Sequence, residues 1–217
     1  MSPEDDLETK RRPIPLPDIR NVQADCLTYD DDQRWLIALI SDTGMRLSEA
    51  CGLRVEDIRL GETIPYINIT PNSSRRLKTK GSARQIPLVG SSLWAAERII
   101  ARTSGSLAFP RYCDGARVKA NSASGYLNKW LRSRVPEGCV VHSFRHSFRD
   151  RLRAVQCPSD MIDALSGWST SGVGSSYGDG FQLGQKVQWM RKFVSDVVFN
   201  RSLFLERTLA VIRSNAQ

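Results

Sequence analysis

Apolar residues recur at helical spacing over most of the chain. After three acidic residues at 30–32, apolar side chains stand at Trp35, Leu36, Leu39 and Ile40, which predicts a helix capped by one of the aspartates and ending near Gly44. The same spacing recurs further along. It predicts helices at 47–51, 91–102, 122–134, 144–155, 159–165 and within 198–213.

Two segments of the chain do not follow this helical pattern. From Thr63, apolar residues alternate with polar ones through Ile64, Ile67 and Ile69, and an apolar stretch returns at 85–88 after a basic polar segment. Such alternation is typical of strands, so we expect a small antiparallel sheet. Residues 1–27 are polar and rich in proline, which predicts an extended lead-in. The predicted fold class is α+β, mainly helical.

Composition narrows the choice of partner. The 217 residues, 41% of them apolar, suffice for one domain, and the net charge of +8 with a pI near 9.5 favours a polyanion such as nucleic acid. A solvated basic surface without a partner remains the alternative. No apolar run is long enough to span a membrane, and the N-terminus lacks the pattern of a signal peptide, which predicts a cytoplasmic protein. The five cysteines have no C-x-x-C spacing and are expected to be reduced, mostly buried thiols.

Four segments carry residues suited to act on a phosphodiester. DNA strand transfer without metal or ATP needs a nucleophile, cations that hold the phosphate, and an acid for the leaving oxygen. Candidates stand in Thr-Gly-Met-Arg-Leu-Ser-Glu (43–49), Leu-Lys-Thr-Lys-Gly-Ser-Ala-Arg-Gln-Ile-Pro-Leu (77–88), His-Ser-Phe-Arg-His (142–146) and the segment from Gly-Trp to Tyr (167–177). Any one of these segments alone is weak evidence, because isolated residues of these types more often lie on a surface or in a core.

Together and in this order, the segments resemble the catalytic domain of tyrosine recombinases of the phage-integrase family. That family has an Arg in a T-G-x-R-x-S-E turn, a Lys in a β-hairpin, H-x-x-R-H, a Gly-His or Gly-Trp pair, and a Tyr nine residues further on. The resemblance runs from about residue 30 to 180, and Tyr177 follows Trp168 by nine residues. It implies the fold of DNA breaking-rejoining enzymes and a site-specific recombinase that uses no metal and no cofactor.

The resemblance also implies roles for individual residues. Arg46 and Arg145 would grip the non-bridging oxygens of the scissile phosphate, since a planar guanidinium donates two parallel hydrogen bonds. Tyr177 would attack the phosphorus, giving a 3′-phosphotyrosine and a free 5′ hydroxyl. His142 would assist proton movement.

The hairpin lysine is either Lys78 or Lys80, and we favour Lys78 because a Lys-Thr pair ahead of Arg and Ile-Pro fits the family pattern better. It would protonate the leaving 5′ oxygen. The other basic residues of this segment are expected to contact backbone phosphates. These are Arg75, Arg76, Lys80 and Arg84.

The chain departs from the commoner family pattern at two places. Trp168 replaces a more frequent His, and an indole N–H donates a hydrogen bond but cannot transfer a proton, so we expect a positioning role. Ser143 and Phe144 replace a frequent Asp-Leu, which touches no catalytic atom. His146 is expected to support the site from behind, and Glu49 to support the Arg46 turn.

Domain organisation and partners follow from the same resemblance. We divide the chain into a lead-in (1–27), a catalytic core domain (28–182) and a C-terminal helical tail of that domain (183–217), which packs in cis or in trans. The core-binding domain usual in this family does not precede the pattern, whether by truncation or by nature. We expect double-stranded DNA, a homotetramer on that DNA, and a place at the nucleoid. A type IB topoisomerase and a catalytically silent DNA-binding regulator are the alternatives.

Overall fold

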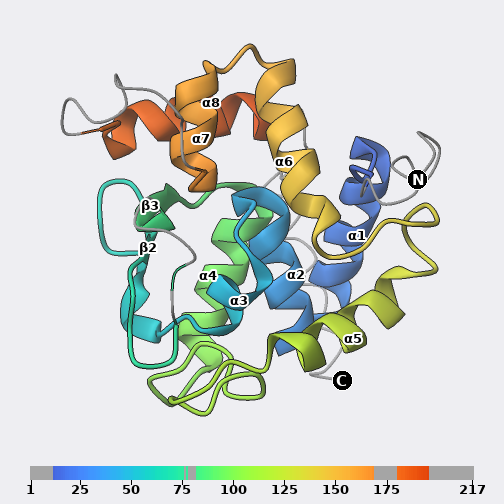
Figure 1. Ribbon diagram of the computed structural model, residues 1–217, viewed down its shortest axis with the longest axis vertical. Helices are drawn as coiled ribbons and strands as arrows, with labels where there is room; N and C mark the ends of the chain where they lie inside the picture. Colours follow the sequence, from blue (N-terminus) through green and yellow to red (C-terminus); the bar gives the residue numbers. More distant parts are fainter. Residues whose placement is uncertain (1–11, 76, 78–81, 169–179, 196–217) are drawn as a thin grey trace, which may run out of the picture.

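The computed structural model describes residues 12–75, 77, 82–168 and 180–195. Over these ranges the chain forms eight α-helices and one small antiparallel sheet (Figure 1), which confirms the predicted fold class. The helices are α1 Leu16–Tyr29, α2 Asp32–Thr43, α3 Leu47–Cys51, α4 Gly90–Arg102, α5 Ala120–Leu131, α6 Ser143–Ala154, α7 Ser159–Ser166 and α8 Leu183–Ser195. The strands are β1 Ile58–Arg59, β2 Tyr66–Ile69 and β3 Arg84–Pro87.

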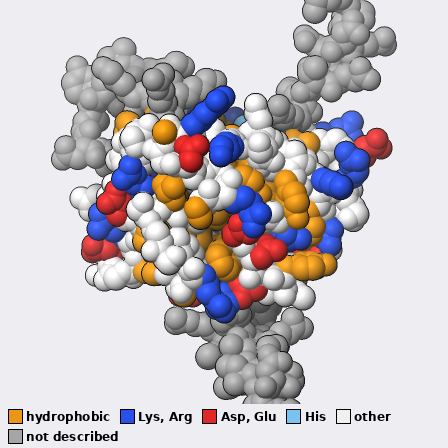
Figure 2. Space-filling model, turned by 90° about the horizontal axis from the view of Figure 1, so that it is seen from below, with side chains coloured by type: hydrophobic (Ala, Val, Ile, Leu, Met, Phe, Trp, Pro, Cys, Tyr) orange, Lys and Arg blue, Asp and Glu red, His pale blue; other side chains and the backbone are white. Residues whose placement is uncertain are grey.

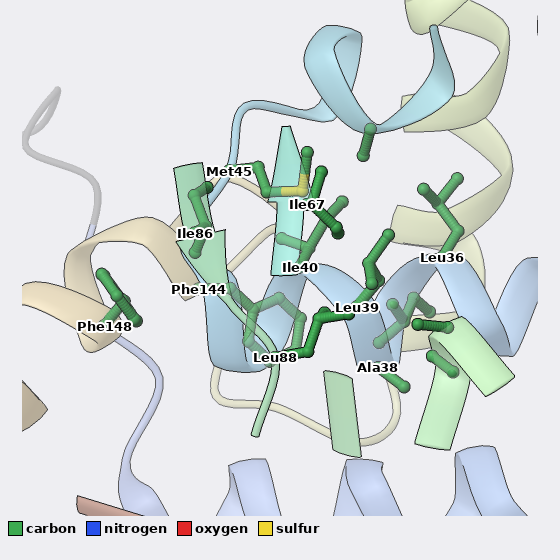
Figure 3. Packing of buried hydrophobic residues seen from close by; sticks show 14 of the residues in the cluster. Leu36, Ala38, Leu39, Ile40, Met45, Ile67, Ile86, Leu88, Phe144 and Phe148 are labelled. Carbon is green, nitrogen blue, oxygen red and sulfur yellow. The ribbon is translucent and has the colours of Figure 1, made fainter. Parts of the chain in front are cut away.

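Helix α2 is the centre of the core. Asp31 caps it by accepting a hydrogen bond from the Arg34 amide at 2.9 Å, and Gly44 ends it in the left-handed conformation. Eleven of its twelve residues are buried because α1, α4 and α6 pack around it. Figure 3 shows apolar side chains of α2 meeting residues of the sheet and of α6. The labelled members are Leu36, Ala38, Leu39, Ile40, Met45, Ile67, Ile86, Leu88, Phe144 and Phe148.

The sheet has the order β1-β2-β3, and both strand pairs are antiparallel. Ile67 pairs with Ile86 and with Ile58, so the buried face of the central strand meets apolar partners on both sides. Strand β1 and the 3₁₀ turn before it (Val55–Asp57) were not predicted, because two or three residues are too few to show a period. Helices α7 and α8 pack against β3.

The extended lead-in predicted for residues 1–27 is wrong from Leu16 onward, where α1 begins. Pro15 and Pro17 stand before and within its first turn, where proline is compatible with a helix and even pre-organised for it. Apolar burial follows at Ile19, Val22 and Cys26, which is helical spacing. Helix α1 packs on α2 and shares its core.

The tail is helical in its described part. Helix α8 was not separately predicted, and its Val187, Met190 and Phe193 are buried against the same core. The helix predicted within 198–213 lies outside the described residues. All five cysteines are free thiols and four are buried, Cys139 being only partly covered, as expected.

Figure 2 shows one face of the molecule, seen from below the view of Figure 1. Basic and acidic side chains are interspersed on it, so this face carries no block of a single charge. No helix in the described part of the chain is long and apolar enough to cross a membrane.

Candidate active site

Arg46 lies in the turn between α2 and α3. Gly44 makes this turn possible, because its φ is +60° and an added Cβ would lie 2.5 Å from Phe148 Cδ1. Glu49, one helical turn further on, accepts hydrogen bonds from the Arg46 amide at 2.9 Å and from Arg46 Nη1 at 2.8 Å. The Arg46 side chain remains 21% exposed. The carboxylate therefore fixes this guanidinium while part of it stays accessible.

Arg145 reaches the same place from α6. Its side chain is buried, and its two terminal nitrogens donate to backbone carbonyls, Nη1 to Gly44 and Nη2 to Ser166, both at 2.7 Å. Burial, followed by the positive charges of Arg46 and Arg84, lowers the pKa of Arg145 from 12.5 to about 9. It remains cationic at neutral pH, in surroundings that favour a nearby anion.

Arg84 completes the cluster from β3, and its position differs from the prediction. Its side chain is buried; Nη2 donates to Glu49 at 3.0 Å and Nε to the Leu165 carbonyl at 2.9 Å. Burial alone would raise the pKa of Glu49, but the charge of Arg84 and hydrogen bonds from Arg84 and Arg46 outweigh it and lower the pKa. Arg84 therefore ties the hairpin to α3 and α7.

Arg75 is also turned inward. It is 2% exposed, its Nη1 pairs with Asp57 at 2.9 Å, and its Nε and Nη2 donate to the Thr70 carbonyl at 2.9 and 2.7 Å. These bonds hold the start of the hairpin connection against the 3₁₀ turn. No sequence pattern predicts this orientation, because a basic run between strands is more typical of an exposed hairpin tip.

Trp168 follows the end of α7. Gly167 ends that helix with φ +65°, and an added Cβ there would lie 2.7 Å from Arg84 Nη1. The Trp168 amide then donates to the Asp163 carbonyl at 3.1 Å. The Arg145 guanidinium carbon lies 4.7 Å from the centroid of the Trp168 ring, so the indole packs on the arginine of the H-x-x-R-H segment.

The two histidines stand at the start of α6. His142 directly precedes the helix and is exposed, and His146 is one turn on, partly buried. Their ring centroids are 5.4 Å apart in an edge-to-face arrangement. This contact joins the two histidines of the H-x-x-R-H segment, and the supporting role of His146 stays a prediction.

The structure thus brings Arg46, Arg145 and Trp168 together. Arg46 Nη2 points to the Gly167 carbonyl at 3.5 Å, and Arg46 Nη1 to the hydroxyl of Ser82, at the returning end of the hairpin, also at 3.5 Å. Four predicted residues lie outside the described part of the chain and keep their status as predictions: Arg76, Lys78, Lys80 and Tyr177.

Sequence reasoning missed two basic residues beside this cluster. Arg149 lies over Trp168, and its spacing of four from Arg145 places both on one face of α6. Lys186 of α8 is buried and donates to the Gln85 carbonyl at 3.2 Å, and burial, followed by the charge of Arg84, lowers its pKa. No cluster of three or more His, Cys, Asp or Glu suited to a metal occurs among the residues described.

Fold and site together define a mainly helical domain in which three arginines, Arg46, Arg84 and Arg145, gather at one place. A model of the phage integrase family matches residues 21–179, a range that contains all four motif segments. The chain belongs to the phage integrase family.

Two solved structures extend this comparison to the fold. The Tn1549 transposon integrase in complex with transposon right end DNA is similar at a TM-score of 0.55 and 16% identity, over 86% of this chain and 67% of that one. A complex of that integrase with circular intermediate DNA gives 0.55 and 16%, over 77% and 65%. This chain therefore spans about two thirds of those chains or slightly less. Among curated proteins, no sequence matches it.

Proposed function

We propose that this chain is the catalytic part of a site-specific recombinase that cuts and rejoins double-stranded DNA through a 3′-phosphotyrosine at Tyr177. The observation that carries the proposal is the positive charge of the arginine cluster. Three guanidiniums, those of Arg46, Arg84 and Arg145, meet around the single carboxylate of Glu49. The excess positive charge requires an anion, and a phosphodiester is the anion that two fixed guanidiniums fit best.

The two catalytic arginines have different environments, and this suits a clamp. Arg145 is immobilised by two carbonyls, and Arg46 by the carboxylate of Glu49. Donors fixed in advance need no reorganisation when charge builds up on the phosphate oxygens during attack. In this proposal Arg46 and Arg145 hold the non-bridging oxygens and stabilise the transition state.

The remaining chemistry is assigned to residues of the motif segments. The Tyr177 oxygen attacks phosphorus and its proton passes to His142 or to water; the bond to the 5′ oxygen breaks, and Lys78 gives that oxygen its proton. The indole N–H of Trp168 donates to the phosphate. Rejoining reverses these steps, because the phosphotyrosine bond keeps the energy of the broken phosphodiester.

Two of the four residues predicted to contact DNA phosphates are proposed to have structural roles instead. Arg84 and Arg75 are proposed to hold the hairpin in place, since both are buried and paired with carboxylates. Arg76 and Lys80 stay proposed contacts to the DNA backbone. The active form is proposed to be a homo-oligomer on DNA at the nucleoid, a tetramer as the family resemblance implies.

The covalent intermediate provides the test. The chain is incubated, without metal or ATP, with a library of nicked duplexes of randomised sequence, in which the short fragment released by cleavage diffuses away and traps the adduct. We expect denaturant-resistant protein–DNA adducts with the wild type, enriched in one core sequence, and none with Tyr177→Phe. Absence of adducts with the wild type, or their persistence in Tyr177→Phe, would refute the proposal.

A further inference from the structure

Arg149 is an arginine without an assigned role, directly beside the arginine cluster. It is half-buried on α6, one turn after Arg145 and on the same face of the helix. Its guanidinium carbon lies 4.7 Å from the centroid of the Trp168 ring, the same distance as that of Arg145. One indole therefore contacts two cations, which come from successive turns of a single helix.

The other contacts of Arg149 do not explain its place. Within the described part of the chain, no carboxylate lies in ion-pairing range of it, whereas Arg151 and Arg153 on the same helix pair with Asp42 and Asp150. The Nε of Arg149 is inaccessible to solvent and has no hydrogen-bond partner in the described part. Since a buried N–H without a partner is unfavourable, the indole contact is what offsets this cost.

The Trp168 ring is partly buried and packs against the hydrophobic core, and contacts on its face restrict it further. The backbone of Trp168 is held by the turn at Gly167 and by the bond to Asp163, but neither sets the direction of the side chain. A positively charged guanidinium over the ring face is attracted by the ring electrons, and this restricts the ring to the plane beneath it. Arg145 supplies one such contact and is itself held by two carbonyls. Arg149 supplies the second.

We infer that Arg149 is a positioning residue: it holds the Trp168 indole against Arg145 and so keeps the indole N–H directed at the phosphate. The effect of Arg149 on cleavage rests on the proposed function, whereas its contact with Trp168 does not. A contact from Arg149 to a DNA phosphate is the competing interpretation. The inaccessible Nε and the half-buried side chain favour the positioning role.

The first experiment measures single-turnover adduct formation at saturating DNA, using the core sequence enriched from the nicked library. Arg149→Met keeps the length of the side chain and removes its charge, and Arg149→Lys restores a cation. Arg153→Met is the matched control, because Arg153 is exposed on the same helix. We expect Arg149→Met to slow adduct formation roughly tenfold with little change in DNA affinity, Arg149→Lys to recover part of the rate, and the control to behave as wild type.

The second experiment tests whether Trp168 transmits the effect. In a Trp168→Ala background, Arg149→Met should cause no additional loss of rate, since the ring it positions is gone. A loss as large as in the wild-type background would overturn the inference. A slope of binding against salt that becomes shallower by about one, with the rate at saturation unchanged, would make Arg149 a phosphate contact instead.

The third experiment does not depend on activity. The chain has five tryptophans, and the indole N–H signal of Trp168 is identified in a ¹⁵N–¹H spectrum by its loss in Trp168→Phe. We expect this signal to move in Arg149→Met and to stay in place in Arg153→Met. An unmoved signal overturns the contact, and a moved signal with an unchanged cleavage rate overturns its functional role. If the wild type forms no adduct, the proposed function fails while this measurement still decides the contact.

Discussion

At the residue scale, Arg145 differs from its neighbours in the partners that hold it. Arg46 and Arg84 share the carboxylate of Glu49, whereas both terminal nitrogens of Arg145 donate to neutral carbonyls. Its charge is thus not cancelled locally, and its lowered pKa reflects that cost. A phosphate at the arginine cluster would supply the missing negative charge.

Arg145→Lys should therefore abolish cleavage without abolishing DNA binding. A lysine keeps the charge but cannot donate from two fixed terminal nitrogens to Gly44 and Ser166 and still face a phosphate. We expect adduct formation to fall by roughly a hundredfold or more, and Arg46→Lys to behave in the same way. Single-turnover trapping together with a low-salt binding assay separates the two effects. Cleavage at the wild-type rate in either variant would contradict the clamp.

Glu49 is the residue on which the geometry of the cluster depends. Because its pKa is lower in the folded state, its contribution to stability is present above the unfolded pKa of about 4.3 and is lost as the pH falls through the folded pKa. Glu49→Gln should lower the free energy of unfolding by about 3 kcal/mol at neutral pH, as expected when one partner of a buried ion pair is removed.

Urea unfolding across a pH series measures this difference. The gap between wild type and Glu49→Gln should be full above about pH 5, begin to shrink below the unfolded pKa of about 4.3, and close as the pH falls through the lower pKa of the folded state. Glu97→Gln, at an exposed position on α4, is the control and should show almost no gap. A gap for Glu49→Gln that does not depend on pH would contradict the assigned charge state.

At the scale of elements, two short turns position the residues of the site. Gly44 ends α2 ahead of Arg46, and Gly167 ends α7 ahead of Trp168; both have positive φ and leave no room for a Cβ. Each glycine therefore fixes the backbone turn from which the following functional side chain, Arg46 or Trp168, extends. Arg84 connects the two turns, through Glu49 on one side and the Leu165 carbonyl on the other.

Two glycine substitutions should change stability in opposite directions. Gly167→Ala places a methyl group against Arg84 in a left-handed backbone, and we expect a loss of roughly 1–2 kcal/mol or more. Gly125→Ala lies in α5 with nothing within 4 Å of the added Cβ, and should stabilise by about 0.5–1 kcal/mol. Thermal or urea unfolding measures both. Equal changes in the free energy of unfolding for the two variants would show that the turn at Gly167 does not limit stability.

The sequence predicts the long elements of this fold well and its short or inward-facing features poorly. Helices such as α2 and α7 were found within a residue or two, since eight or more residues establish a period. Helix α1 was missed because prolines at its start resemble a linker. Arg75 and Arg84 were assigned to the DNA because a basic side chain that pairs with a distant buried carboxylate leaves no local signal. The motif segments, in contrast, are predicted to form one site, and Arg46, Arg145 and Trp168 lie close together in the structure.

At the scale of the whole molecule, the charge of +8 supports DNA binding without specifying where it occurs. The face in Figure 2 carries both signs of charge. The excess positive charge of the site comes instead from the local arrangement of three arginines around one acid. We therefore expect the affinity for DNA to depend on a limited number of phosphate contacts.

Binding of duplex DNA should weaken with salt, with a log–log slope of about −0.9 for each phosphate neutralised. We expect Arg76→Gln and Lys80→Gln each to make this slope shallower by about one. Arg111→Gln is the control, because Arg111 is paired with Asp32 in the free protein. Fluorescence anisotropy over a salt series measures the slopes. An unchanged slope in both hairpin variants would exclude the hairpin as a DNA contact.

The most direct test of the proposed mechanism identifies the residue that is joined to DNA. The trapped adduct is digested with nuclease and protease, and the peptide that carries the residual nucleotide is sequenced by mass spectrometry. We expect a nucleotide that is linked through its 3′ phosphate to the oxygen of Tyr177. A linkage to another residue such as Tyr126 or Ser175, or through a 5′ phosphate, would contradict it.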